Sequence, residues 1–529
     1  MQACRAVSVL LMLGCTGKTD TGTPGTSPPD TSTETGTAPS TPPMDLQCTE
    51  QADNVLRFDC TAVTTATARA RYRHDTTKVE HVGPWVEGGP WTLWGLEAGA
   101  TYHVQLEALV DGVVQDTDAA TTLQVGQALG PSRPAPFDQL TIRAATRPGG
   151  SPPVSYVAAP VQCGPDQAVV VVNSAGDLVW YQHVPSGTVT GMGVTEEGLL
   201  QLGLDARTVT TWTMDGQIAH EVDYGAEACD SGVGPCPHHD VMQSADGYWA
   251  LEAVLDADNG ASGLSGCEDK TEYAVDHLVR YDDDGLRQQT IAFDLDLGYE
   301  PDVDLGPNHD PDKPDPACES SYYGGVLGDP DPPISYTHTN ALWIDDSGLY
   351  ASLKQWDQLL AIDPDDSSLV WRLHASDPDY SDFATPIGVA PSIVDNAEAR
   401  FANQHHVTRL DQGWLQILDN LGGSGSRVLR ISLDEAGSTA LIEEAYAVVD
   451  DDDGTWQAPS LLSCPNRGSA YAMETGVLTA CPDVATVVFL DQPDGTVTAG
   501  PAWSVAFHCG ENTAVGLYRA PPLATLWPE

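Results

Sequence analysis

Apolar and polar residues alternate over short stretches of this chain. In Ala68–Arg73 small or aromatic residues alternate with arginine, and His103–Ala108 alternates in the same way. Successive side chains of a strand point to opposite faces, so this pattern is typical of half-buried strands. Beyond residue 154 no long stretch has the 3.6-residue apolar period of a helix. We therefore expect an all-β protein.

From residue 154 to residue 529 the chain repeats one theme, in which two short strands flank a turn that contains glycine. The glycines of six such turns are Gly176, Gly216, Gly247, Gly348, Gly413 and Gly495. Several repeats run about 40–50 residues, as the blades of a propeller do. We expect residues 154–529 to form a β-propeller, and six is the blade count that we choose.

Residues 45–126 form a separate group of short strands. Within them the pattern Gly-Leu-x-x-Gly-x-x-Tyr over residues 95–102 resembles the tyrosine corner of fibronectin type III and related sandwiches. We expect a small β-sandwich here that serves as a spacer. Residues 127–153 contain six prolines, which predict a linker, or a strap onto the next domain.

The N-terminus has the features of an export signal. Arg5 precedes an apolar run that is too short to span a bilayer and ends in Leu-Gly-Cys. This ending resembles a bacterial lipobox, which implies a signal peptide over residues 1–15, a lipid on Cys15 and attachment to the outer membrane; plain secretion is the alternative. Residues 16–44 are almost only Thr, Ser, Gly, Pro, Asp and Glu, so we expect a disordered tether.

The net charge of −53 arises from 76 acidic and 23 basic residues. Such a surface repels polyanions, which excludes nucleic acid as a partner. It also makes any cation near a candidate site notable. Two acidic stretches, 302–315 and 450–454, do not follow the calcium-loop pattern of EF-hands, so we expect solvated loops there.

The chain has twelve cysteines, and ten remain once Cys4 is removed with the signal and Cys15 is lipidated. An even number in an exported protein predicts disulfides. Cys163 and Cys509 stand near the two ends of the large domain and are placed to join them. Proximity suggests the further pairs Cys48–Cys60, Cys464–Cys481, and Cys229–Cys236 or Cys267–Cys318.

Three repeats carry a histidine in one sequence frame. His239 and His405 each lie eight residues before the glycine of the next turn, and His338 lies ten residues before it. If the strands are regular, these even offsets place the three side chains on the same face. Equivalent positions of different blades point at one central axis. We therefore expect the three histidines to meet at one end of the channel.

Several motifs around these histidines resemble those of the bacterial arylsulfotransferases. The matching segments are His-His-Asp-Val at 238–241, Thr-His-Thr-Asn at 337–340, Phe-x-x-Gln-His at 401–405, Leu-Asp-Asn at 418–420, Ser-Arg at 426–427 and the tail at 515–520. The likeness covers about residues 155–520. It implies an enzyme without a cofactor that moves a sulfuryl group from a phenolic sulfate ester to another phenol by a ping-pong route.

The resemblance implies a role for each histidine. His405 matches the nucleophile that carries the sulfuryl group, and His239 and His338 match residues that bind sulfuryl oxygens or exchange protons with the phenols. Lys354 stands where the family has an arginine; lysine keeps the charge but loses the planar fork that grips two oxygens. A propeller with weakened catalysis that binds a surface ligand is therefore the alternative function.

Four more residues complete the predicted substrate site: His238, Asn340, His406 and Arg427. His238 and His406 are expected to pack or to support their neighbours, and the roles within each His-His pair are open to exchange. Arg427 is a second candidate cation. We expect no metal at the site; a three-histidine zinc centre, as in a metal-dependent hydrolase, is the rival chemistry.

Overall fold

The computed structural model describes most of residues 45–526. The gaps are 53, 131–132, 134–135, 185–188, 196–199, 205–207, 224–235, 245, 257–272, 299–333, 386, 392–399, 421–424, 451–459, 466, 494–499, 511 and 514–516. All described residues belong to one compact unit, Pro43–Glu529. They contain strands and two short 3-10 helices, η2 (Pro378–Tyr380) and η4 (Pro482–Val484), and no α-helix. The all-β prediction is confirmed.

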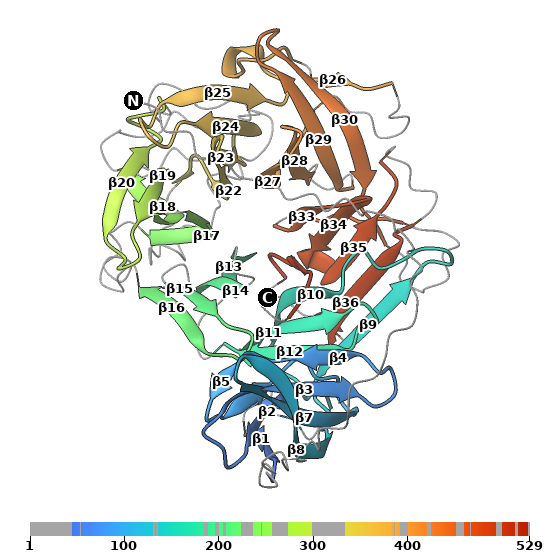
Figure 1. Cartoon of the computed structure of the whole chain (residues 1–529). Coiled ribbons are helices and arrows are strands. Elements are labelled where there is room, and N and C mark those ends of the chain that lie inside the picture. Colours follow the sequence, from blue (N-terminus) through green and yellow to red (C-terminus); the bar gives the residue numbers. More distant parts are fainter. Residues whose placement is uncertain are drawn as a thin grey trace, which may run out of the picture. The chain divides into compact units, whose positions relative to one another are not determined.

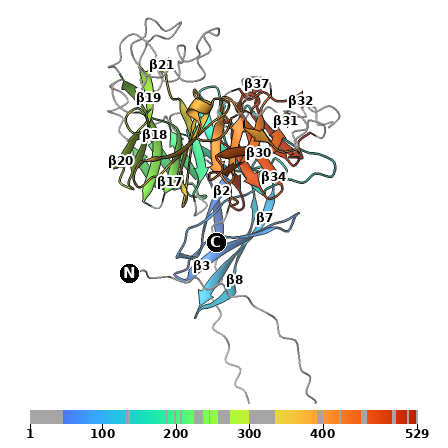
Figure 2. The same ribbon diagram turned by 90° about the horizontal axis from the view of Figure 1, so that it is seen from above.

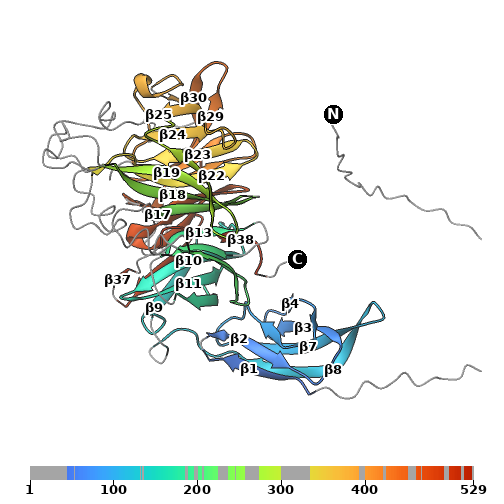
Figure 3. The ribbon, with the colours of Figure 1, turned by 90° about the vertical axis from the view of Figure 1, so that its left-hand side faces the viewer.

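The N-terminal strands form two facing sheets (Figure 3). One sheet contains β1 (Gln47–Gln51), β2 (Asn54–Thr61) and β6 (Trp91–Leu93). The other contains β4 (Glu80–Val82), β3 (Thr67–His74), β7 (Thr101–Val110) and β8 (Val113–Gln124), with β5 (Val86–Glu87) beside β3. The predicted tyrosine corner is present, because the Glu97 amide donates a 3.1 Å hydrogen bond to the hydroxyl of buried Tyr102.

Six further sheets of the described residues surround a common centre (Figure 1). The first contains β10 (Tyr156–Cys163), β11 (Asp166–Asn173), β12 (Leu178–His183) and β38 (Pro522–Leu523). The second contains β13 (Val189–Val194), β14 (Leu200–Leu204), β15 (Thr208–Trp212) and β16 (Ile218–Asp223). The third contains β17 (Cys236–Ser244), β18 (Gly247–Asp256), β19 (Tyr273–Tyr281) and β20 (Arg287–Ala292), with β21 (Ile334–Ser335) beside β19 (Figure 2).

The remaining three sheets follow in chain order. The fourth contains β22 (Thr339–Asp345), β23 (Gly348–Leu353), β24 (Gln358–Ile362) and β25 (Leu369–His374). The fifth contains β27 (His405–Arg409), β28 (Leu415–Asp419), β29 (Arg427–Asp434), β30 (Thr439–Ala447) and β26 (Gly388–Val389). The sixth contains β33 (Ser469–Met473), β34 (Gly476–Cys481), β35 (Thr486–Leu490), β36 (Trp503–Cys509) and β37 (Asn512–Thr513); β31 (Val449–Asp450) and β32 (Ser460–Leu461) pair separately. This is a six-bladed propeller, as predicted.

Strands from opposite ends of the chain close the ring. β9 (Leu140–Thr146) pairs with β36 at the edge of the last blade, and β38 pairs with β10 in the first blade. The Cys163–Cys509 disulfide joins the same two blades. The linker interpretation of residues 127–153 is therefore wrong for β9, and the strap alternative describes it.

Two other predicted disulfides, Cys48–Cys60 and Cys464–Cys481, are also present. Cys229, Cys267 and Cys318 lie outside the described residues, and so do residues 1–44 with Cys15.

The sandwich contacts the propeller through buried polar groups. Trp94 donates a 2.7 Å hydrogen bond from Nε1 to the carbonyl of Leu526, and it packs in the same core cluster as Leu523 of β38. Asn54 donates a 2.6 Å bond to the carbonyl of Tyr181 in β12. The sandwich therefore holds the C-terminal segment that completes the first blade, a role that a spacer alone does not include.

Candidate functional site

The predicted histidines lie on or directly before the innermost strands of three successive blades, β17, β22 and β27 (Figure 1). Each strand has a β-bulge there, between His238 and Val241, between Thr339 and Ala341, and between His405 and Thr408. A bulge inserts residues that break the alternation of faces. Regular strands, which the sequence argument assumed, are therefore not the reason why the histidines meet.

The backbone shows which histidines are equivalent. His239 and His406 both have left-handed φ values of 53°, whereas His238 and His405 are the last paired residues before their bulges. His239 is therefore equivalent to His406, and His238 to His405. The sequence frame, which matched His239 with His405, is wrong by one residue. His338 is also left-handed, with a φ of 46°. Such conformations cost about 1–2 kcal/mol in non-glycine residues and gather at functional sites.

The structure nevertheless brings His239, His338, His405 and Lys354 together. The rings of His239 and His338 lie 5.3 Å apart between centroids, and the charge of Lys354 acts on all three histidines. Burial is the main cause that lowers the pKa of each histidine, to about 3 for His405. The cluster therefore consists of neutral imidazoles beside a cation at neutral pH.

Hydrogen bonds fix the proton of His405. Its Nδ1 lies 2.9 Å from both the Asn403 carbonyl and Oδ1 of Asn420. The Asn420 amide nitrogen donates to the carbonyls of Cys464 and Arg467, so its oxygen must face the ring. Two acceptors require a proton on Nδ1 of His405. Nε2 therefore carries a lone pair, and it accepts a 3.1 Å hydrogen bond from the Arg467 amide.

A second network holds His238 and His239. Nε2 of His238 lies 3.0 Å from Oδ1 of Asp276, and both side chains are fully buried. The Nδ1 atoms of His238 and His239 lie 2.6 Å apart. Oδ2 of Asp276 accepts hydrogen bonds from the Thr337 hydroxyl, at 2.8 Å, and from the Thr339 amide. His238, predicted to support its neighbour, thus joins His239 to a buried carboxylate.

His338 directly precedes β22, and its Nδ1 lies 2.9 Å from the Ser335 hydroxyl. The predicted substrate residue Asn340 is buried and donates to the Gln404 carbonyl at 2.7 Å, which links the fourth and fifth blades. Its Oδ1 atom is buried and makes no hydrogen bond with the described residues. An orphaned acceptor of this kind is suited to a bound donor such as a phenol hydroxyl.

Two predicted site residues have structural contacts instead. The guanidinium of Arg427 is buried against Asp419, with 2.8 Å between Nε and Oδ2, and also donates to the Arg400 carbonyl. His406 accepts a 3.1 Å bond from the Ala470 amide and packs on Tyr471. Arg427 as the second cation is therefore not supported by its contacts, and His406 packs as expected.

Arg519 and Asp276 were not among the predicted site residues, although Arg519 lies in the tail motif at 515–520. Arg519 is buried, pairs with Asp240 at 2.9 Å and donates to the Gly468 carbonyl, and its guanidinium lies over Tyr518. Arg519, which lies between β37 and β38, thus joins β17 to the residue before β33, and its charge acts on His405. The available signal for Asp276 was a carboxylate inside the apolar run of β19.

A second cation accompanies Lys354. Burial, followed by the charge of Arg467, lowers the pKa of Lys354, and Asp357 opposes this shift. Arg467 is an exposed residue that lies beside the cluster, because its backbone amide bonds Nε2 of His405. No group of three or more His, Cys, Asp or Glu side chains among the described residues is arranged to hold a metal ion.

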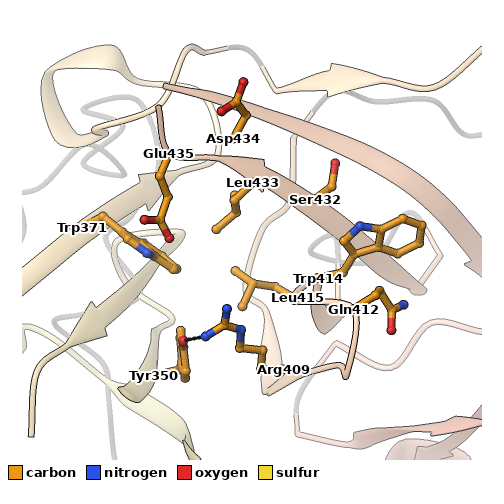
Figure 4. Close-up of a pocket in the computed structure, with 11 residues that line it drawn as sticks. Tyr350, Trp371, Arg409, Gln412, Trp414, Leu415, Ser432, Leu433, Asp434 and Glu435 are labelled. Carbon is orange, nitrogen blue, oxygen red and sulfur yellow. Dashed lines mark hydrogen bonds between the residues drawn. The ribbon is translucent and has the colours of Figure 1, made fainter. Parts of the chain in front are cut away.

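A separate pocket of about 350 Å³ lies at the junction of the fourth and fifth blades (Figure 4). Trp371, Tyr350, Arg409, Trp414 and Glu435 are among its lining residues, and Arg409 donates to the Tyr350 hydroxyl. It contains none of the clustered histidines. No helix in the described part of the chain is long and apolar enough to cross a membrane.

No family model matches this chain, and no curated protein matches it. Solved structures similar to it include a protein of unknown function from Bacteroides caccae, with 11% identity and a TM-score of 0.36 over 65% of this chain and 93% of that one. Another is a putative 6-phosphogluconolactonase from Bacteroides uniformis, with 10% identity and a TM-score of 0.31 over 84% and 100%. BamB from Moraxella catarrhalis has 10% identity and a TM-score of 0.29 over 67% and 89%.

Proposed function

We propose that this propeller is an aryl-sulfate sulfotransferase that uses His405 as its nucleophile. The observation that supports this most is the fixed tautomer of His405, whose Nδ1 proton is held by Asn403 and Asn420 while Nε2 carries the lone pair. A neutral imidazole of this kind attacks an electrophile without first losing a proton. Its low pKa keeps it neutral over the physiological range.

In the first half-reaction, Nε2 of His405 attacks sulfur, the N–S bond forms and the S–O bond to the phenol breaks. The first phenol leaves as a phenolate, because His239 and His338 are neutral. In the second half-reaction an acceptor phenol gives its proton to His239 or His338 and attacks sulfur, and the N–S bond breaks; that proton then passes to the phenolate, so the complete cycle balances. Lys354 and Arg467 stabilise the charge that spreads over the sulfuryl oxygens.

Two observations favour a ligand-binding propeller as the second candidate. The Arg467 amide already bonds Nε2 of His405 at 3.1 Å, so attack requires that this hydrogen bond break. Lysine also stands at position 354, where the arylsulfotransferases have arginine. Loss of the planar fork weakens the hold on two sulfuryl oxygens. Such a protein would bind an aryl sulfate without turning it over.

The decisive experiment incubates the purified protein with a chromogenic aryl sulfate, with and without a phenol acceptor. We expect phenol release that depends on the acceptor, and its loss in His405→Ala. His406→Ala is the matched control, since it removes the adjacent histidine that packs on Tyr471. Wild-type protein that binds the ester without releasing phenol would establish the binding module instead. Release that persists in His405→Ala would assign another nucleophile.

We also propose that the chain is exported and anchored by a lipid on Cys15, through the sequence Leu13-Gly14-Cys15. Three disulfides support an oxidising compartment. Cells that express the protein should incorporate labelled palmitate into it, and Cys15→Ser should abolish the label. Cys4→Ser, which changes a residue of the removed signal, should leave it intact. Labelled palmitate in the Cys15→Ser protein would contradict the anchor.

A further inference from the structure

The Asp276–His238–His239 network has a directional hydrogen-bond pattern. Asp276 accepts hydrogen bonds at Oδ2 from Thr337 and Thr339, and its Oδ1 faces Nε2 of His238. A carboxylate can only accept, so its 3.0 Å approach favours a proton on Nε2 of His238, although the contact does not have the geometry of an aligned hydrogen bond. If His238 is neutral, its Nδ1 then holds a lone pair. The 2.6 Å contact between the two Nδ1 atoms therefore requires the proton to sit on Nδ1 of His239.

We propose that Asp276 and His238 are positioning residues that make Nε2 of His239 the proton acceptor for the phenol and carry the resulting charge away from His239. A phenol proton moves to Nε2 of His239, and the Nδ1 proton of His239 moves to Nδ1 of His238. His238 becomes an imidazolium paired with Asp276. The reverse transfers return a proton to the leaving phenolate, so no proton is gained or lost overall.

The surroundings explain why His239 needs this arrangement. Burial and the nearby His238, His338, His405 and Lys354 hold its pKa well below the ordinary value, so His239 alone is a poor base. Through the shared proton, the positive charge instead rests beside a buried carboxylate. Tyr518 also lies against His239, with 5.9 Å between ring centroids.

A second carboxylate also interacts with His238. Glu252 on β18 lies near enough to His238 for the two charges to interact, and it is paired with Arg287 at 2.6 Å. Asp276 thus contacts the proton relay formed by His238 and His239 directly, and Glu252 acts from farther away. Lys354 and His405 act on His239, the other member of the pair. The basicity of the His238–His239 pair therefore depends on Asp276.

Asp276→Asn gives a sharp test because Thr339 decides how the new amide is oriented. The Thr339 amide only donates, so the asparagine oxygen must face it and the NH₂ group must face His238. Nε2 of His238 then becomes an acceptor and its Nδ1 a donor. The proton of His239 is forced onto Nε2, where it blocks proton uptake.

The first measurement is the ¹⁵N spectrum of full-length protein labelled at histidine, with His239 assigned through His239→Gln. We expect an unprotonated Nε2 on His239 in the wild type and a protonated one in Asp276→Asn. A protonated Nε2 in the wild type overturns the proposal, and this result does not depend on the folding of Asp276→Asn. The measurement uses no substrate, so it judges the relay even if the proposed transferase activity is absent.

The second measurement is acceptor-dependent turnover of an aryl sulfate against pH, which rests on the proposed function. Asp276→Asn should lower turnover about 10²- to 10⁴-fold and move the acid limb of the profile to lower pH. Asp294→Asn is the matched control, because it removes the carboxylate of another Asp–His pair in the same blade, 3.4 Å from His277. Unchanged turnover and profile in an active Asp276→Asn protein overturn the relay.

Discussion

At the propeller centre, the role of each histidine is decided by its individual hydrogen bonds and not by the residue type alone. His405 and His406 are adjacent and chemically identical. Nδ1 of His405 faces two acceptors, whereas Nδ1 of His406 accepts the Ala470 amide. The two rings therefore carry opposite tautomers. A histidine's role here depends on which backbone groups its ring meets.

Substitution of Lys354 tests whether a cation at this position binds the sulfuryl oxygens. We expect Lys354→Arg to raise aryl sulfate turnover about tenfold, because a planar guanidinium grips two oxygens where an ammonium offers a point charge. Lys354→Met should abolish turnover. Steady-state kinetics with a chromogenic donor measure both, and Lys78→Arg on the exposed surface of the sandwich is the control. If Lys354→Met keeps full turnover, Lys354 does not contact the sulfuryl group.

His374 gives a pH dependence of stability. Burial lowers its pKa from 6.5 to about 4, and its Nδ1 accepts the amides of Ser376 and Asp377. Between these pH values His374 binds a proton in the unfolded chain and does not bind it in the native protein. Its contribution to stability is therefore complete above pH 6.5 and is lost as the pH falls toward 4. This site contributes a slope of about 1.4 kcal/mol per pH unit in that window.

Urea unfolding of His374→Asn at pH 7 and pH 5 measures that slope. The Asn oxygen can accept the same two amides, so we expect near wild-type stability at pH 7 and a shallower decline toward pH 5. His103→Asn, at an exposed histidine of β7, is the control. Equal declines in His374→Asn and the wild type would show that His374 does not contribute.

At the scale of single elements, the bulged inner strands determine the site. The bulges in β17, β22 and β27 break the alternation of faces at the positions that carry His239, Asn340 and His406. This is how His238 and His239 can contact each other while His238 also reaches Asp276 on β19.

The tyrosine corner of the sandwich is a second local feature, and it stabilises the fold. Tyr102→Phe removes the hydroxyl that accepts the Glu97 amide, and we expect a loss of about 1–2 kcal/mol in the free energy of unfolding. Thermal or urea unfolding of the full chain measures it. Thr101→Val, at the neighbouring partly exposed position, should stay within about 0.5 kcal/mol of the wild type. Equal stability of the two variants would contradict the corner's contribution.

At the scale of the whole molecule, closure of the ring depends on both ends of the chain. β9 and β38 each complete a blade that other parts of the sequence began, and Cys163–Cys509 covalently joins the first and last blades. The sandwich adds the hydrogen bond from Trp94 to Leu526. Stability of the propeller is therefore shared among segments more than 300 residues apart, as the disulfide's separation of 346 shows.

Cys163→Ser with Cys509→Ser tests this closure. A link across so long a separation restricts the unfolded chain strongly, so we expect a loss of about 2–5 kcal/mol and a lower melting temperature. Cys48→Ser with Cys60→Ser is the matched control, because that disulfide has a separation of 12 and lies in the sandwich. A ring variant that melts with the wild type would mean that paired strands alone keep the propeller closed.

The sequence predicted the all-β fold and the tyrosine corner, and glycine turns and cysteine spacing suggested six blades and three of the disulfides, because all of these are local signals. It also identified His239, His338, His405 and Lys354 as a group. Only the tertiary structure decided their true register, the strap formed by β9, and the partners Asp276 and Arg467. Bulges shift side chains without changing their spacing in sequence, and a hydrogen bond between residues far apart in the chain leaves no local pattern.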